Sequence, residues 1–469
     1  MLDRPGGGWV ARGAEPSDTG RLVFAGDVMI GRTIGQLIDK YGPDYPFRTV
    51  ESLLREADLA FGNLESPLTT APYVRTGYNL VSDPARVSSL TLVGFDVMAL
   101  ANNHVTDHGA DGLSQILDTL DQAGMAHVGA GRTITEAGQY WVGKAGPVTV
   151  AYLAYDATWG SLAATFDSAG SARPEGPFLE KVAQARQAAD LVVVSVHWGQ
   201  EYEALPGQFQ RGLAQSLARA GVDVVVGHHP HVVQPVEWVS VPGRNRPTLV
   251  AYSLGNFIFD QEFSAETSES ALLTCDVDKQ GLRAAWLVPL HIRRGQVQPV
   301  SSQNGEAVLY RLLHTGYNPP SFEVFSPRKL PDGKLDFQLI WYAAPSPKAP
   351  APALATDVNG DRQPDLLLTT GGRVCVQTAE GQPAWCAPPQ WQIQTAALDD
   401  VDGDGRAELI TLAQQNEEAA PAAGNHVRVW KWDGARFQSL WRSLPGTYRD
   451  LRLADVDGNG THAIVVTTR

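Results

Sequence analysis

The first 260 residues repeat one pattern, in which a short apolar run ends in a polar residue and is followed by a stretch with helical periodicity. Runs such as "ADLVVVSVHWG" and "GVDVVVGHHPH" have strand length, and their apolar composition is typical of strands buried on both faces of a sheet. Between such runs, Leu113, Ile116, Leu117 and Leu120 recur at the spacing of one helix face. Short strands alternating with helices predict an α/β fold.

The polar residues at the ends of the six apolar runs are unusual as a set. One polar residue after a strand is ordinary turn chemistry, but six runs that end in Asp, Glu, Asn or His, with almost no Lys, are not required by turns. In α/β sheets ligands bind beyond the carboxyl ends of the strands. The set has the mixed oxygen and nitrogen character of a site for two cations. It comprises Asp27, Asn63, Glu65, Asn102, Asn103, His104, His197, His228, His229, His231 and Asn256.

Three of the eleven histidines fall within four positions, in the segment "GHHPH". A lone histidine near a strand end is usually a surface or half-buried side chain. Pro230 fixes its own φ and biases His229 toward an extended conformation. In an extended stretch, side chains two positions apart lie on the same side, so His229 and His231 are expected to converge on one point. Imidazole is the commonest metal-ligand side chain.

Composition limits the alternatives. A chain of 469 residues predicts two or three domains, and its net charge of −14 argues against nucleic acid or an anionic membrane as the main partner. No apolar run approaches the length of a membrane span. The first twenty residues have no hydrophobic signal core, which leaves a cytoplasmic protein or one whose leader has been removed. Cys375 and Cys386 have a spacing that a hairpin disulfide could close, which favours an oxidising compartment.

Five ordered motifs carry a family resemblance. "GDVMIGR", "GNLESPLT", "ANNHVTDHG", "HWGQEY" and "GHHPHVVQ" resemble those of the CapA-type poly-γ-glutamate capsule-biosynthesis proteins, a branch of the calcineurin-like metallophosphatase superfamily. The resemblance covers residues 21–315. It implies a two-sheet sandwich with outer helices and a two-metal centre at one edge, holding Mn, Zn or Fe. The implied metal ligands are Asp27, Glu65 (or Asn63), Asn103, His197, His229 and His231, with His104 as the transition-state histidine.

The chain departs from the superfamily pattern at two positions. Met29 stands where the first motif normally has histidine, and Asn63 stands where the second normally has aspartate. Thioether is a poor ligand for hard divalent cations, so one metal position has lost a nitrogen. These departures, which the CapA branch shares, put ordinary phosphatase activity in doubt.

Further roles are expected around the ligands. His104 would donate a proton or hydrogen bond to the leaving group while the two cations activate a bridging water. Asp107 and Arg32 are the other candidate catalytic residues. Arg32, Arg75 and Arg132 are candidates to orient an anionic substrate. Glu201 and Tyr202 are expected to orient His197, and the remaining residues behind the ligands are His228, Asn102 and Asn256.

Beyond residue 315 the sequence changes character. We interpret residues 1–20 as an extension, 21–315 as the metallophosphatase-like domain, 316–350 as a Pro-rich connector and 351–469 as a repeat domain. Three segments there carry carboxylates at alternate positions around a Gly-bearing turn, a ligand pattern that calcium prefers. They resemble FG-GAP/VCBS repeats, which implies an all-β, partial propeller-like domain. The predicted calcium ligands are Asp357, Asn359, Asp361 and Asp365; Asp400, Asp402, Asp404 and Glu408; and Asp455, Asp457 and Asn459 of a weaker third loop that has Ala463 at its last position.

Three functions follow as hypotheses. The first is an exported or surface-associated, metal-dependent hydrolase-like protein of poly-γ-glutamate or related envelope-polymer metabolism. It would act on an anionic polymer or small anionic substrate with envelope-biosynthesis proteins as partners. The second is a phosphoesterase on small phosphate esters. The third is a non-catalytic, metal-stabilised scaffold, which the residues at 29 and 63 favour.

Overall fold

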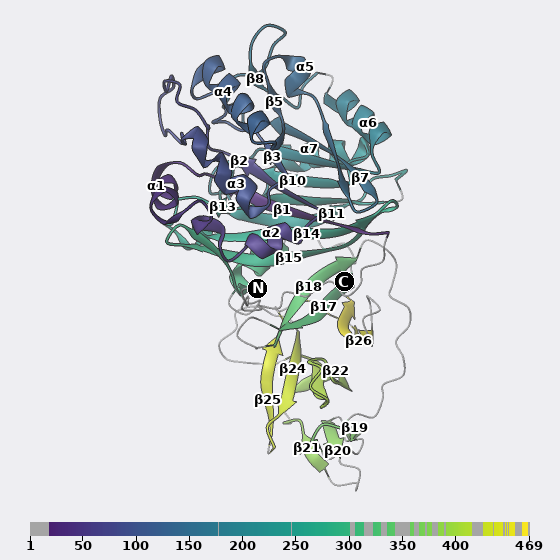
Figure 1. The fold of residues 1–469 in the computed structure, drawn as a ribbon. Helices are drawn as coiled ribbons and strands as arrows, with labels where there is room; N and C mark the ends of the chain where they lie inside the picture. Colours follow the sequence, from purple (N-terminus) through teal and green to yellow (C-terminus); the bar gives the residue numbers. More distant parts are fainter. Residues whose placement is uncertain are drawn as a thin grey trace. The chain divides into compact units, whose positions relative to one another are not determined.

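The computed structural model describes the greater part of the chain. The residues described are 18–300 except Pro177 and Asn245, then 305–313, 322–329, 335–342, 357–360, 365–370, 373–377, 383–388, 391–414, 425–434, 436–443, 446, 448, 450–454 and 462–467. The chain divides into two compact units, one formed mainly by residues 15–300 and the other mainly by residues 317–469. Figure 1 traces both.

The larger unit contains two sheets. In the first, the order is β15-β14-β1-β2-β3-β4, with β13 beside β1 and β16 beside β15. Strands β1 to β4 are parallel, whereas β14 runs antiparallel to β1. The bounds are β1 Gly20–Val28, β2 Leu59–Leu64, β3 Val97–Ala99, β4 Ala126–Val128, β13 Asn256–Ile258, β14 Glu269–Asp278, β15 Gly281–Arg293 and β16 Gln296–Pro299.

The second sheet has the order β11-β12-β10-β9-β7-β6, with four parallel central strands and antiparallel edges. Every residue of β9 is buried, as expected for a strand covered on both faces. A small ribbon, β5 with β8, stands apart. The bounds are β5 Ala130–Gly131, β6 Trp141–Ala145, β7 Val148–Asp156, β8 Gly170–Ser171, β9 Leu191–His197, β10 Val224–His228, β11 Val233–Val239 and β12 Thr248–Leu254.

The two sheets pack face to face, with helices outside (Figure 1). Phe61 of β2 stacks on Tyr152 of β7 with ring centroids 5.5 Å apart. Helices α6 and α7 place Val182 and Leu217 in the apolar layer on the other face of the second sheet. The helices are α1 Arg32–Tyr41, α2 Glu51–Arg55, α3 Val87–Val93, α4 Gly109–Gln122, α5 Ile134–Ala137, α6 Phe178–Ala188, α7 Gln208–Arg219, α8 Ala265–Ser268 and α9 Glu306–Leu313, with short 3₁₀ turns at η1 Tyr45–Phe47 and η2 Pro84–Arg86.

The predicted helix around Leu113 is α4, and its four apolar residues are all buried. The α/β prediction for this unit is therefore confirmed. Local sequence sets several helix ends: the Thr133 side chain accepts a hydrogen bond from Glu136 N at the start of α5, and Gly94, at φ 99°, ends α3 in a left-handed conformation.

The described part of the smaller unit consists of antiparallel sheets. Their orders are β26-β27-β17-β18, β19-β20-β21 and β22-β23-β24-β25. Trp391 stacks on Trp430 at 4.5 Å within their apolar core. The bounds are β17 Phe322–Lys329, β18 Leu335–Tyr342, β19 Leu366–Thr370, β20 Arg373–Gln377, β21 Pro383–Cys386, β22 Gln392–Asp399, β23 Glu408–Gln414, β24 His426–Trp432, β25 Phe437–Arg442, β26 Asp450–Ala454 and β27 Ala463–Thr467.

A disulfide joins Cys375 of β20 to Cys386 of β21, which confirms the predicted hairpin pairing.

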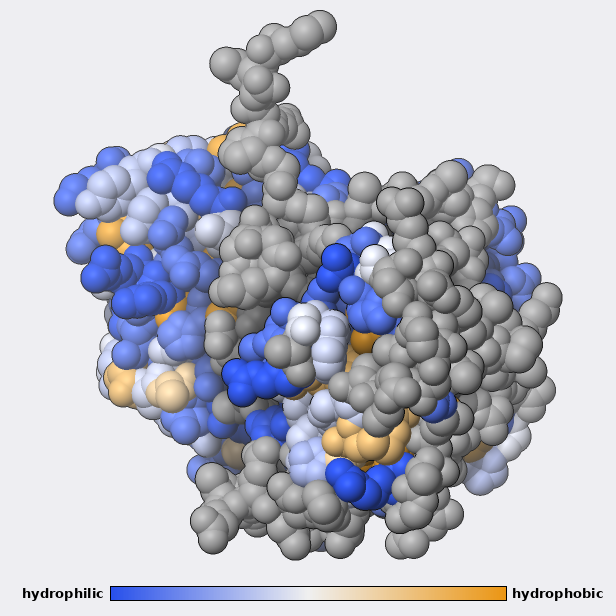
Figure 2. Space-filling model, turned by 90° about the horizontal axis from the view of Figure 1, so that it is seen from below, coloured by the Kyte–Doolittle hydropathy of each residue, from blue (hydrophilic) through white to orange (hydrophobic). Residues whose placement is uncertain are grey.

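On the face shown in Figure 2, the described residues are mainly hydrophilic with small hydrophobic groups among them. Within the described residues, no helix is long and apolar enough to cross a membrane.

Candidate metal centre

The predicted ligands gather where the carboxyl ends of the two sheets meet. In the first sheet, Asp27 of β1 lies in register with Asn63 of β2 and with Asn256 of β13. In the second sheet, His197 of β9 lies in register with His228 of β10. The strand-end positions therefore bring oxygen and nitrogen groups from two hundred positions of sequence to one place, as the rule for α/β sheets predicts.

Glu65, directly after β2, lies at the middle of this group. Its side chain is fully buried, and neither carboxylate oxygen makes a hydrogen bond to a described residue. Imidazole nitrogens surround Oε1: His197 Nε2 at 3.7 Å, His231 Nε2 at 3.8 Å and His104 Nε2 at 3.9 Å. These distances are too long for hydrogen bonds but leave room for a cation between the groups.

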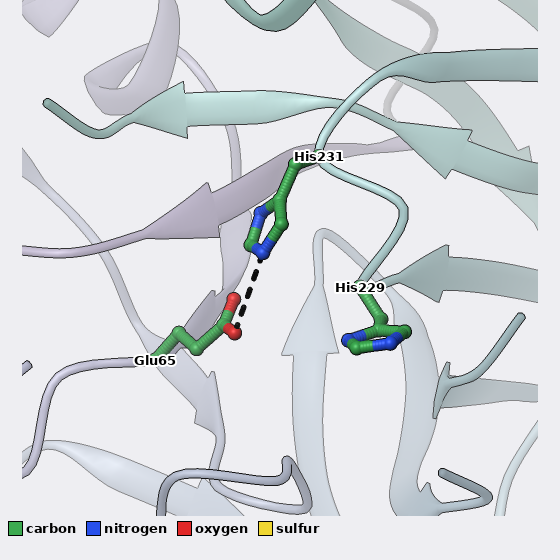
Figure 3. Close-up of side chains that lie close together, drawn as sticks. All are labelled: Glu65, His229 and His231. Atoms are coloured by element: carbon green, nitrogen blue, oxygen red, sulfur yellow. Dashed lines mark ion pairs between the residues drawn. The ribbon is translucent and has the colours of Figure 1, made fainter. Parts of the chain in front are cut away.

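Two sets of three ligand atoms share Glu65. One set joins it to His229 and His231, and the other joins it to Asp27 and His197, with the atoms of each set within 4.8 Å of one another. Figure 3 shows Glu65 facing the two histidines that follow β10. Buried carboxylates are rarely left without a partner. The residues present therefore fit a divalent cation, and the shared carboxylate fits a pair of them.

Hydrogen bonds to neighbouring side chains fix the ring orientations of His231 and His197. His231 Nδ1 faces two acceptors, Asn256 Oδ1 at 2.9 Å and Asp27 Oδ2 at 3.4 Å. This arrangement favours a proton on Nδ1 and turns Nε2 toward Glu65. His197 lies between Asn63 Nδ2 at 3.3 Å and Asn103 Oδ1 at 2.9 Å.

Asn102 makes hydrogen bonds that hold Asn63 and the end of β2 in place beside the cluster. Its Nδ2 donates to Asn63 Oδ1 at 3.2 Å and to the Leu64 carbonyl at 2.8 Å. Asn63 Nδ2 in turn donates to Asp27 Oδ1 at 2.9 Å. The two amides therefore link the ends of β1 and β2 in one hydrogen-bonded chain.

Burial and mutual charge separate the pKa values of these groups. Burial raises the pKa of Glu65 well above its ordinary value, and the charge of Asp27 adds to this, although His231 opposes it. Burial, followed by the charge of His231, lowers the pKa of His229 to about 4. Burial also works against protonation of His231, but Glu65 and Asp27 outweigh it and raise its pKa to about 9.

The backbone of the "GHHPH" segment differs from the expectation. His229 has φ 96° and His231 has φ 58°, so neither lies in the extended region that Pro230 was expected to favour for His229. Hydrogen bonds hold this turn: His229 N donates to Asp27 Oδ2 at 3.3 Å, and Tyr202 N donates to the Pro230 carbonyl at 2.8 Å. The rings of His229 and His231 still lie beside Glu65, because the left-handed turn directs both side chains toward it. Left-handed non-glycine residues are strained and concentrate at functional sites.

A second histidine–carboxylate pair lies at the edge of the centre. His104 Nδ1 lies 2.7 Å from Asp107 Oδ2, while its Nε2 points toward Glu65. Arg75 reaches Asp107 Oδ1 at 3.4 Å and donates to the Asn103 carbonyl at 3.1 Å. It also donates to the Gly160 carbonyl, so Arg75 ties three loops together beside His104.

Arg32 and Arg132, which were predicted to orient an anionic substrate, make ion pairs with neighbouring carboxylates. Arg32 pairs with Asp260 at 3.0 Å, and Arg132 pairs with Asp118 at 2.6 Å. Both guanidinium groups thus already have carboxylate partners, and neither contacts the cluster among the described residues. Tyr202 lies beside His231, with ring centroids 6.2 Å apart, and its predicted role in orienting His197 stays a prediction.

Glu201, also predicted to orient His197, is exposed, and its charge acts on Glu65 and His231. Phe259, which packs edge-on against His231 at 5.0 Å, was not predicted. Its only sequence signal is its place three residues after the strand-end Asn256.

Met29 is fully buried, and its sulfur accepts a hydrogen bond from Gly31 N at 3.1 Å. The thioether therefore stabilises the turn after β1.

The smaller unit contains a separate carboxylate cluster. Asp400, Asp402 and Asp404 bring oxygens within 4.8 Å of one another. Lys431 of β24 contacts Asp402 directly, lies 2.7 Å from Asp404 Oδ2 and lies 3.3 Å from Glu408 Oε1. Burial, then the charge of Asp402, raise the pKa of Glu408 to about 7.

The first repeat loop is built in the same way. Asp365 Oδ2 accepts from Val358 N at 2.8 Å, as Glu408 Oε2 accepts from Val401 N at 3.2 Å. Among the predicted calcium ligands, Asp361, Asp455, Asp457 and Asn459 lie outside the described residues.

The larger unit thus defines an α/β protein with a buried carboxylate, amide and imidazole site suited to divalent cations. A family model, "Bacterial capsule synthesis protein PGA_cap", matches residues 21–261. The chain is 34% identical over 303 residues to the capsule biosynthesis protein CapA of Bacillus anthracis, covering 62% of this chain and 72% of that one. It is 32% identical over 323 residues to the PGA biosynthesis protein CapA of Bacillus subtilis strain 168, covering 67% and 81%. The chain therefore belongs to the PGA_cap family.

More distant similarities also exist. A probable polyglutamine synthesis accessory protein of Mycobacterium tuberculosis is 26% identical over 346 residues, covering 62% of this chain and 89% of that one. Among solved structures, a novel phosphatase from Mycoplasma pneumoniae aligns with 58% of this chain and 94% of its own at 13% identity, with a TM-score of 0.36. That structural likeness is too loose to bear on function.

Proposed function

We propose that this chain is a metal-dependent hydrolase of poly-γ-glutamate or related envelope-polymer metabolism, with a metallophosphatase-like centre in its larger unit. The observation that carries the chemistry is Glu65, a fully buried carboxylate that makes no hydrogen bond to a described residue and faces three imidazole nitrogens. The polymer class is supported by the two CapA relatives.

The cations would be held by seven side chains, Glu65 and six others around it. Bound Mn, Zn or Fe would supply an activated water and a positive charge for the developing oxyanion. The residues are Asp27, Asn63, Glu65, Asn103, His197, His229 and His231.

His104 is placed to transfer a proton. Asp107 holds Nδ1, so Nε2 faces the space beside Glu65, where a leaving group would be protonated. Arg75 keeps Asp107 in place and leaves part of its guanidinium exposed toward solvent. The roles of Arg32 and Arg132 in orienting an anionic substrate stay proposals, in which each guanidinium would contact the substrate beside its carboxylate partner, Asp260 or Asp118.

The test uses the full chain, stripped of metal with a chelator and reloaded separately with Mn²⁺, Zn²⁺ or Fe²⁺. Poly-γ-glutamate and a nitrophenyl phosphodiester serve as substrates. Release of shorter polymer by the loaded protein supports the proposal if it is lost in Glu65→Gln and kept in His127→Gln, which changes a half-buried histidine that pairs with Asp121. Cleavage of the phosphodiester alone would identify a phosphoesterase instead.

A second candidate is a non-catalytic scaffold in which the cations are structural. It is favoured by Met29, whose sulfur accepts a hydrogen bond from Gly31 N. It is also favoured by Asn63, which donates a hydrogen bond to Asp27 and has no negative charge to bind a cation. Bound metal without turnover of either substrate would support it.

For the smaller unit we propose FG-GAP/VCBS-like, propeller-related repeats that bind Ca²⁺ at the loops of Asp357 and Asp400. Support comes from their matching loop hydrogen bonds and from the convergence of Asp400, Asp402 and Asp404. The disulfide supports an exported or surface location. Calcium titration of the full chain by calorimetry tests the binding, and absence of any uptake would contradict it.

A further inference from the structure

His228 is a buried polar residue that the proposed chemistry does not use. It ends β10 after three valines, and only 1% of it is exposed. Its Nδ1 lies 3.2 Å from Asp27 Oδ1, yet neither ring nitrogen completes a well-formed hydrogen bond to a described residue. A buried polar atom left in this state is unfavourable, whereas a leucine would fill the same space without that penalty.

The position of His228 is fixed by its strand. Its carbonyl accepts from Trp198 N at 3.0 Å, and it lies in register with His197. At the preceding Gly227, a Cβ atom would lie 2.0 Å from the Tyr252 carbonyl oxygen. The neighbouring strands of the second sheet are therefore closely packed here, and the ring of His228 lies against Asp27 of the first sheet.

Asp27 is the group that this ring meets. Its Oδ1 accepts from Asn63 Nδ2 at 2.9 Å and faces His228. Its Oδ2 faces His229 N at 3.3 Å and His231 Nδ1 at 3.4 Å. The two carboxylate oxygens thus have separate surroundings, and His228 is the contact on the Oδ1 side that comes from the opposite sheet.

We propose that His228 is a positioning residue of the metal centre, whose Nδ1–H holds Asp27 Oδ1 and thereby fixes the carboxylate for cation binding. This inference rests on the proposed metal centre but not on the identity of its substrate. Hydrogen-bond partners behind metal ligands orient them, and their loss weakens metal affinity by about 10- to 100-fold. A histidine that merely fills the core would instead support the fold equally with and without metal.

The test compares His228→Leu, His228→Asn and Tyr152→Phe in the full chain. Leucine removes the donor while filling the space, and the Asn Nδ2 can take the place of the imidazole Nδ1. Tyr152 is the matched control, because its hydroxyl is also buried and makes no hydrogen bond to the described part of the chain, but lies outside the ligand group. Mn²⁺ affinity is measured by calorimetry on chelator-stripped protein, and stability is measured by urea unfolding in EDTA.

His228→Leu should bind Mn²⁺ about 10- to 100-fold more weakly while unfolding in EDTA at the same urea concentration as the parent or higher. His228→Asn should recover most of the affinity, and Tyr152→Phe should leave affinity unchanged. The role would be overturned if His228→Leu bound Mn²⁺ as tightly as the parent. It would also be overturned if His228→Leu lost as much stability in EDTA as it lost in Mn²⁺ binding free energy. A parent protein that takes up no Mn²⁺ would refute the centre and this role together, whereas metal uptake without polymer cleavage would refute only the proposed chemistry.

Discussion

Replacing Glu65 by glutamine should change stability in opposite directions without and with metal. In the metal-free protein, Glu65 is a fully buried carboxylate whose oxygens make no hydrogen bond to described residues. Glutamine keeps the shape and removes the charge. The buried amide stays polar but carries no charge, and burying a charge costs more than burying a neutral polar group, so the metal-free variant should be more stable than the parent by about 1–3 kcal/mol.

With metal the order reverses. A cation present at a hundred times its dissociation constant stabilises the parent by about 2.7 kcal/mol, and the variant loses most of this. Each kcal/mol corresponds to about 2–4 °C in melting temperature for a unit of this size. Differential scanning calorimetry in EDTA and in Mn²⁺ should thus show the two melting curves exchange order.

The pH dependence has a definite sign. Because burial raises the pKa of Glu65 in the folded state, the parent loses stability as pH rises from the ordinary carboxyl value through the raised one. The advantage of Glu65→Gln in EDTA should grow over that range. A variant that melts well below the parent in EDTA would show that Glu65 has a structural partner, which would refute the argument.

Four further outcomes are expected. His229→Ala should lose bound metal by elemental analysis while its melting temperature in EDTA stays within a few degrees of the parent. Metal binding at pH 7 should release protons, because the pKa of His231 is about 9 before binding, and calorimetry in buffers of different ionisation enthalpy should detect this release; a buffer-independent heat would contradict it. Asp107→Asn should lower turnover about a hundredfold with metal content unchanged, and unaltered turnover would remove the pair from the mechanism. Lys431→Met should weaken the loop around Glu408 unless Ca²⁺ is added, and equal melting of variant and parent in EDTA would contradict this.

Sequence predicted the parts of this protein that follow from periodicity. The valine-rich runs specify buried strands, and because parallel strands end at one edge, Asp27, Asn63 and His197 could be placed together without coordinates. Backbone conformation could not be predicted in the same way. The left-handed turn at His229 depends on the hydrogen bond that His229 N donates to Asp27 and on the one that Tyr202 N donates to the Pro230 carbonyl, and both partners come from other parts of the chain.

The partners of the ion pairs could not be predicted from the sequence either. Arg32 forms an ion pair with Asp260, 228 positions further along the chain. Lys431 forms one with Asp402, 29 positions before it. Such pairs are set by which loops the fold brings together, so a loop arginine could not be assigned to substrate from its local motif. His228 was predicted to lie behind the ligands, but its contact with Asp27 could not be named from the sequence, because this contact crosses between the two sheets.

Anomalous diffraction from crystals grown with Mn²⁺ would show whether Glu65 and the histidines around it bind a cation. One or two peaks are expected beside the Glu65 carboxylate, within bonding distance of the nitrogens of His231, His229 and His197. Clear density for these side chains in the same crystals, with no anomalous peak among them, would contradict it.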